Sequence, residues 1–146
     1  MNRIISTFIF LVSSFLLSQS PLDKTYWESM NQTEKFSFIQ GFLTAIHEST
    51  VILKNEVNER LSHDPYWRPP LELDRTARKL KDYLHTDPDY DYTQLTNLID
   101  IFYTNPDNNN IDLLTAIKIL VLHENGKKQH ANEMLLMKQK EYLKDN

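Results

Sequence analysis

The stretch from Asn31 to Leu61, NQTEKFSFIQGFLTAIHESTVILKNEVNERL, decides the fold of this chain. Residues of one helix face recur through it at alternating steps of three and four: Phe36, Ile39, Leu43, Ile46, Thr50, Leu53, Val57 and Leu61. Asn31 and Glu34 have the spacing of a capping box, in which each side chain accepts a backbone N–H of the other residue. The pattern predicts one long amphipathic helix along which the later segments pack.

The composition narrows the class of protein. The chain has 146 residues, enough for one domain, and a formal net charge of −4 with both signs spread along it. Because it has no basic run or basic–aromatic stripe, nothing indicates nucleic-acid binding. Gly occurs only twice and Cys is absent, which argues against tight-turn β folds, phosphate-binding loops, disulfides and thiolate metal sites.

Residues 1–20 have the features of a secretory signal peptide, with Arg3 before an apolar run that is shorter than the roughly 20 residues of a bilayer span. Ser18 and Ser20 provide small residues for cleavage, but Pro21 would follow a cut after Ser20. Cleavage after Ser18, an uncleaved anchor and a buried N-terminal helix are the alternatives. We expect export to the periplasm or the medium, no membrane span after cleavage, and one helical domain at residues 21–146.

Four further helices are expected after the long one, joined by short polar loops, at residues 71–84, 93–103, 111–123 and 127–144. Asn110 or Asp112 is expected to begin the 111–123 helix, and Gly126 to end it. The predicted fold class is all-α, a compact bundle of about five helices organised on the long helix.

Several residues are expected to determine the packing. Trp27 precedes the long helix, and we interpret it as a core anchor that folds onto the start of that helix. Gly41 lies inside the helix, where Gly costs about 1 kcal/mol relative to Ala, so a helix or an aromatic ring is expected to approach it closely. Phe102 and Tyr103 end a helix before an Asn-rich turn, and are the aromatic residues expected to pack against Gly41.

The loop Ser62 to Pro70, SHDPYWRPP, ends the long helix with three prolines, which impose extended or turn conformations. We expect Tyr66, Trp67 and Arg68 on this loop to contact a partner protein. The alternative is a satellite cluster that closes one end of the bundle.

No catalytic, metal-binding or nucleotide-binding motif is found. His47-Glu48 lacks a second His four residues on, and the five His of the chain have no ligand spacing. The acidic turn at 85–92 lacks the Gly and the closing Glu of a calcium loop. We therefore expect no enzyme, no metal and no cofactor. The alternative is a ligand-binding or enzymatic pocket around His47 and Glu48, with Asp100 as a further candidate.

Two stretches carry a resemblance. The first is Trp27…Met30-Asn31…Glu34-Lys35-Phe36…Ile39-Gln40-Gly41-Phe42, and the second runs from Leu98 to Ile111, LIDIFYTNPDNNNI. Together they resemble segments of small secreted helical proteins of bacteria, most of them uncharacterised. More distantly, the chain is similar to periplasmic immunity proteins of type VI secretion amidase effectors, which commonly have cysteines that are absent here.

The resemblance implies a periplasmic protein partner, in its sharpest form a peptidoglycan amidase toxin whose active-site cleft is blocked. From the residues themselves, we expect an exported protein that binds another protein. The alternatives are the small-ligand or enzymatic pocket and a structural envelope protein without a stable partner. A homodimer is a further expectation, because the apolar stripe of the long helix is wide enough for two neighbours.

Overall fold

The computed structural model describes residues 22–87 and 89–144, so the predicted signal peptide lies outside the described residues. Within these ranges the chain is all-helical, with six α-helices, one of them long, and no strand. The additional helix is α2, in the segment before the long helix. The elements are α2 Lys24–Ser29, α3 Gln32–His63, α4 Leu71–Lys81, α5 Tyr92–Phe102, the 3-10 helix η1 Pro106–Asn108, α6 Leu113–Glu124 and α7 Lys128–Lys144.

The long helix α3 begins and ends where the local sequence requires. The capping box is confirmed: Asn31 Oδ1 accepts from Glu34 N at 3.0 Å, and Glu34 Oε2 accepts from Asn31 N at 2.8 Å. The helix runs for 32 residues, about 48 Å. It ends at Asp64, which is extended (φ −138°, ψ 98°) because the following residue is Pro65.

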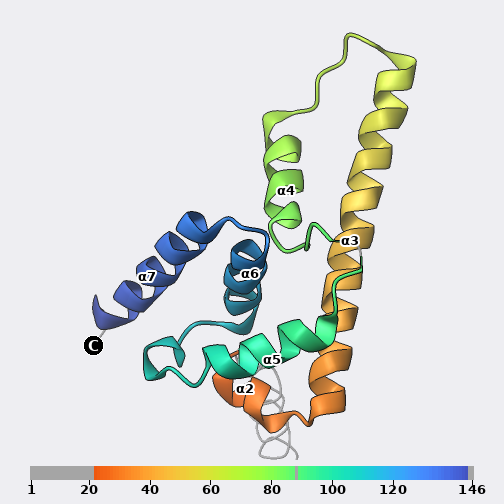
Figure 1. Ribbon diagram of the computed structural model, residues 1–146. Helices are drawn as coiled ribbons and strands as arrows, with labels where there is room; N and C mark the ends of the chain where they lie inside the picture. The colour runs from red at the N-terminus through yellow and green to blue at the C-terminus, as the bar shows by residue number, and fades with distance from the viewer. Residues whose placement is uncertain (1–21, 88, 145–146) are drawn as a thin grey trace, which may run out of the picture.

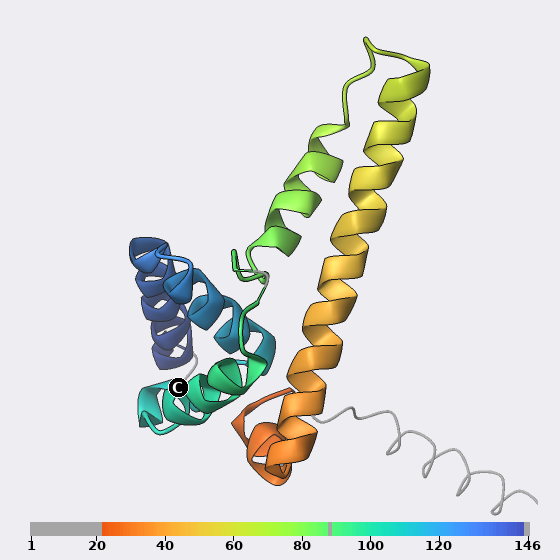
Figure 2. The ribbon, with the colours of Figure 1, turned by 45° about the vertical axis from the view of Figure 1, so that its right-hand side comes forward.

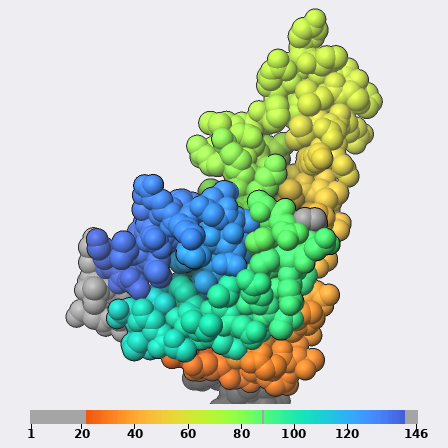
Figure 3. Space-filling model, viewed as in Figure 1, coloured from red at the N-terminus to blue at the C-terminus, as the bar shows by residue number. Residues whose placement is uncertain are grey.

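The helices form two parts (Figures 1 and 2). The first half of α3 packs with α2, α5, α6 and α7 into a domain, whereas the second half of α3 and the antiparallel α4 form a hairpin that projects from it. We call this hairpin, residues 46–81, the arm, and Figure 3 shows its outer part standing clear of α5, α6 and α7. The buried residues of α3 all lie in its first half (Lys35, Ile39 and Leu43), and α4 has none. The expected compact bundle along the whole of α3 therefore describes only the domain.

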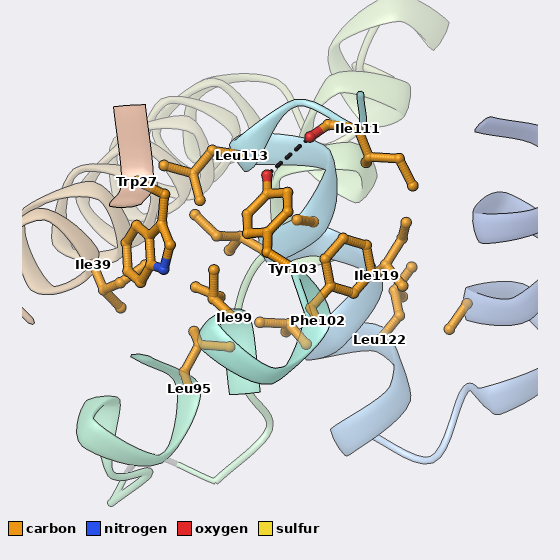
Figure 4. Close-up of a cluster of buried hydrophobic side chains, with 14 of the residues drawn as sticks. Trp27, Ile39, Leu95, Ile99, Phe102, Tyr103, Ile111, Leu113, Ile119 and Leu122 are labelled. Carbon is orange, nitrogen blue, oxygen red and sulfur yellow. Dashed lines mark hydrogen bonds between the residues drawn. The ribbon is translucent and has the colours of Figure 1, made fainter. Parts of the chain in front are cut away.

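The central helix of the domain is α6 rather than α3. Its buried residues face several directions, as its nearly continuous apolar sequence predicts: Leu113, Ala116, Ile117, Ile119, Val121 and Leu122. They pack with Trp27, Ile39 and α5 in one cluster (Figure 4). Gly126 has φ +77° and follows α6, and the N–H of Lys127 reaches the carbonyl of Leu122 at 2.9 Å. This is a Schellman ending, and it confirms the predicted stop.

Trp27 is fully buried, as expected of a core anchor. The prediction that a helix or an aromatic ring approaches Gly41 closely is wrong. Gly41 is exposed, and a Cβ atom there would meet no atom within 4 Å. Phe102 and Tyr103 are buried in the domain cluster instead, and Tyr103 Oη donates to the carbonyl of Ile111 at 2.8 Å. The aromatic end of α5 therefore packs toward α6, because α6 carries the larger apolar surface.

The sequence offered two candidates, Asn110 and Asp112, for the start of the helix after the turn that follows α5, and the structure uses Asp112. Asn110 is exposed, and the cap of α6 is Asp112, whose side chain accepts from Thr115 N at 2.9 Å. The buried Asn is Asn108: its Nδ2 donates to the carbonyl of Phe102 at 2.8 Å, and its Oδ1 accepts from Gln139 Nε2 at 2.8 Å. Asn108 faces inward because the carbonyl that ends α5 is buried and needs a donor.

Candidate functional site

The two helices of the arm, α3 and α4, contact each other through apolar side chains, and we call this line of contact the seam. A groove of about 210 Å³ runs beside it, with Lys54, Asp74 and Lys81 among its lining residues. The apolar part of the lining comes from both helices and the loop: Leu53, Val57, Pro69, Leu73 and Ala77. None of these five is fully buried. The seam therefore stays partly open to solvent.

Polar interactions do not close the arm. Within the described ranges, no hydrogen bond or ion pair joins α3 to α4. The charged side chains pair inside their own helix, Arg60 with Glu56 at 2.7 Å and Arg78 with Asp74 at 2.7 Å. Exposed pairs of this kind contribute only a few tenths of a kcal/mol. The arm is thus held by its seam and by the loop at its tip.

The predicted contact residues lie at the tip of the arm. Tyr66 is 89% exposed, whereas Trp67 is partly covered by the Arg60 guanidinium, 5.7 Å from its ring centroid. Arg68 is exposed, and its Nη1 donates to the carbonyl of Trp67 at 3.1 Å. The loop therefore closes the end of the arm and not the end of the domain. Tyr66 is its most exposed aromatic residue.

By length and composition alone, α3 is apolar enough to cross a membrane. One window of 18 residues has a mean hydropathy of 1.2, and only 11% of that window is buried. Core helices of globular proteins and signal sequences meet the same criterion. Because so little of this window is buried, apolar surface of α3 is left uncovered by the rest of the described chain.

A cavity of about 370 Å³ lies where the arm meets the domain. His47 lines it, as expected of the alternative pocket, but Glu48 is exposed and is not part of the lining. The other walls come from α3 and from the segment between α4 and the start of α5: Leu43, Thr44, Leu84, His85, Thr86, Asp87, Tyr90 and Tyr92. The sequence did not predict the second wall, because only the tertiary structure brings residues 84–87, 90 and 92 to the same cavity as His47.

The turn that forms this second wall is held in place. His85 Nδ1 accepts from Asp87 N at 3.0 Å, so the neutral ring carries its hydrogen on Nε2. The same ring stacks on Tyr90, with the centroids 3.9 Å apart. Asn125, the C-cap of α6, clamps the turn to the domain: its Oδ1 accepts from Thr86 N at 2.8 Å, and its Nδ2 donates to the carbonyl of Leu84 at 2.9 Å.

Tyr90 carries the one buried side-chain polar atom without a hydrogen-bond partner among the described residues. Burial, with the carboxylates of Glu124 and Asp91 nearby, raises the pKa of Tyr90 to about 12. The phenol therefore stays uncharged at neutral pH, and its ring acts as a wall of the cavity.

Asp100 is not part of the cavity. It joins three helices, because Trp27 Nε1 and Lys35 Nζ donate to its Oδ1 at 2.7 Å each and Gln32 Nε2 donates to its Oδ2 at 3.0 Å. Burial opposes ionisation of Asp100, but the hydrogen bonds from Lys35, Gln32 and Trp27 outweigh it and lower its pKa. Asp100 thus has a structural role and does not serve the pocket near His47.

No family model, no curated protein and no solved structure matches this chain. Within residues 22–87 and 89–144, no three His, Asp or Glu side chains converge in a way that could hold a metal ion. The arm and the cavity are therefore the features of the described chain on which the functional proposals are based.

Proposed function

We propose that this protein is an exported helical protein that binds another protein through its arm. The observation that carries the proposal is a two-helix arm that projects from the domain with its apolar seam only partly covered.

The energetics of the arm favour a partner. Leu73 and Ala77 line the groove with Leu53 and Val57 of α3, yet no residue of α4 is fully buried, so α4 gains little from burial. A helix of 11 residues is marginal by itself in water and depends on packing. A partner helix or loop laid over the seam would remove further apolar surface of both helices from water.

The tip adds an anchor for recognition. Tyr66 is the most exposed large apolar side chain among those described, and it stands on a loop stiffened by Pro65, Pro69 and Pro70. Aromatic residues dominate binding hot spots, and a preorganised loop loses less entropy on binding. The resemblance to immunity proteins implies a cell-wall-degrading amidase, with its active-site cleft blocked, as the partner. In the sharpest form of the proposal, we infer from the exposure of Tyr66 that the tip of the arm is the part that enters this cleft.

Site-specific photo-crosslinking in the periplasm of a bacterial host tests the proposal. A photoreactive phenylalanine analogue replaces Tyr66 in one variant and Ile101 in the control; Ile101 is also exposed but lies on α5 in the domain. We expect one partner protein to crosslink at position 66 and not at 101. Trp67→Ala should weaken the isolated complex at least tenfold, and circular dichroism checks that the variant folds.

Other outcomes would contradict the proposal. Crosslinking only at 101 would move the interface to the domain. Crosslinking at 66 to lipid or to a second copy of the chain would replace the protein partner by a membrane or by a homodimer. If the partner is captured but its cell-wall hydrolysis continues unchanged with the protein in excess, binding survives and the inhibitory form does not.

A further inference from the structure

We propose that the cavity between α3 and residues 84–87, 90 and 92 is a binding site for a small, uncharged, hydroxylated ring of monosaccharide size. The site is independent of the proposed arm interface, because no residue of the tip lines it.

The size of the cavity limits the ligand. Sites for small molecules usually measure about 300–1,000 Å³, and a cavity of about 370 Å³ lies at the small end of that range. It suits one ring rather than a chain of rings or a fused cofactor. Leu43 and Leu84 provide apolar surface, and the rings of Tyr90 and Tyr92 provide faces against which the C–H groups of a saturated ring can pack.

The polar groups of the lining suit hydroxyl groups. His85 offers its Nε2–H as a donor, since its Nδ1 already accepts from Asp87 N. Asp87 offers a carboxylate acceptor, one oxygen of which also accepts from Asp89 N at 3.0 Å. Thr44 and His47 add side chains that both donate and accept. Each hydroxyl group of a polyol also donates and accepts, so a mixed lining matches it better than it matches a purely accepting or purely donating ligand.

The charge of the lining argues against an anion. Asp87 is the only Asp, Glu, Lys or Arg side chain among the nine residues that line the cavity. A carboxylate or phosphate ligand would meet this negative charge with no Lys or Arg in the lining to offset it.

The walls are formed before any ligand arrives. Asn125 holds Thr86 and Leu84 to the end of α6, and stacking on Tyr90 holds the His85 ring. A site whose polar groups are already oriented loses little conformational entropy on binding. We therefore assign to Asn125 the role of a positioning residue for the turn.

Amide NMR titration of the isotope-labelled mature protein at pH 7 tests the site directly. The probes are glucose, N-acetylglucosamine and myo-inositol, with acetate as the anionic control. We expect at least one neutral probe to cause saturable shifts confined to the amides around Thr44, His47 and residues 84–87, with a dissociation constant in the millimolar range or below. Acetate should cause no saturable shift there.

Variants separate binding from folding. His47→Phe places a larger apolar ring at the cavity from an exposed position of α3 and should weaken binding at least tenfold, whereas the exposed His130→Phe on α7 should leave it unchanged. Tyr66→Ala should also leave it unchanged, so loss of the arm interface does not affect this test. The absence of saturable shifts with all neutral probes, shifts with acetate alone, or equal affinity in His47→Phe would overturn the proposal.

Discussion

Asp100 is the residue on which three helices depend. Its carboxylate accepts from Trp27 of α2, from Lys35 and Gln32 of α3, and belongs itself to α5. The side chains of Lys35 and Asp100 are 11% and 31% exposed, so the pair is largely withdrawn from water. Removing one partner of such a pair leaves the other charge without compensation.

We expect Asp100→Asn to lower the free energy of unfolding by about 2 kcal/mol, because hydrogen bonds to charged groups contribute about 1.5–3 kcal/mol. Urea unfolding followed by circular dichroism measures this change. The matched control is Asp107→Asn, since Asp107 is exposed and its carboxylate makes no hydrogen bond among the described residues; its midpoint should move little. Equal midpoints for the two variants would refute the role of Asp100.

The same carboxylate predicts a pH dependence. The pKa of Asp100 is lowered in the folded state from the ordinary 3.8, so its contribution to stability is present above pH 3.8 and is lost as the pH falls through the folded-state pKa. A protonated Asp100 resembles the Asn of the variant. The stability difference between wild type and Asp100→Asn should therefore be constant from pH 7 to 5 and shrink below pH 3.8. A difference that persists undiminished at pH 3 would contradict this assignment.

The two glycines predict opposite effects of the same substitution. Gly41→Ala should stabilise the protein by about 1 kcal/mol, because Ala favours the helix and its Cβ meets nothing within 4 Å. Gly126→Ala should destabilise it by about 1 kcal/mol, because φ +77° is costly for a residue with a Cβ. Thermal unfolding of both variants checks the signs, and a destabilised Gly41→Ala would mean that another segment contacts α3 there.

At the scale of whole elements, α6 and α4 represent opposite ends of the range of burial. Half of the 12 residues of α6 are buried, whereas α4 has no buried residue. Both helices are amphipathic or apolar in sequence and both have short connections. They differ because α6 packs against both α5 and α7, whereas α4 packs mainly against α3.

Two Leu→Ala substitutions should report this difference. Leu122 is fully buried, and Leu122→Ala should cost about 3 kcal/mol through lost transfer energy and a residual cavity. Leu73→Ala in the arm should cost about 1 kcal/mol or less, because Leu73 already contacts water. Urea unfolding gives both values. A similar large loss in each would mean that the arm folds as part of the domain core.

Caps show how much of each element local sequence determines. Asn31 and Glu34 begin α3 and Gly126 ends α6, as predicted, because a cap involves groups within a few residues of one another. The expected packing at Gly41 was wrong because it required knowing which distant segment lies beside that residue. Asn108, Asn125 and His85 gave no signal, since their partners are residues far along the chain or in the wall of a cavity.

At the scale of the whole molecule, the proposed binding function requires export. We expect the full chain, expressed in a bacterial host, to be recovered from the periplasm by osmotic shock with residues 1–18 or 1–20 removed. Intact mass spectrometry distinguishes the two cleavage sites. A variant with Arg3→Glu and with Leu11 and Leu16 changed to Asp should stay in the cytoplasm. Full-length wild-type protein confined to the cytoplasm would contradict the predicted signal peptide.

The sequence by itself determined the all-helical class, the approximate bounds of the later helices and their caps, because helix periodicity and capping act over one or two turns. It did not determine that α3 is shared between a domain and an arm. An apolar stripe has the same spacing whether one neighbour or several cover it, so burial depends on where the other helices pack. Only the tertiary structure placed Tyr66 at the tip of an open arm and brought His47 of α3 beside His85 and Tyr90, because these positions depend on contacts between distant parts of the chain.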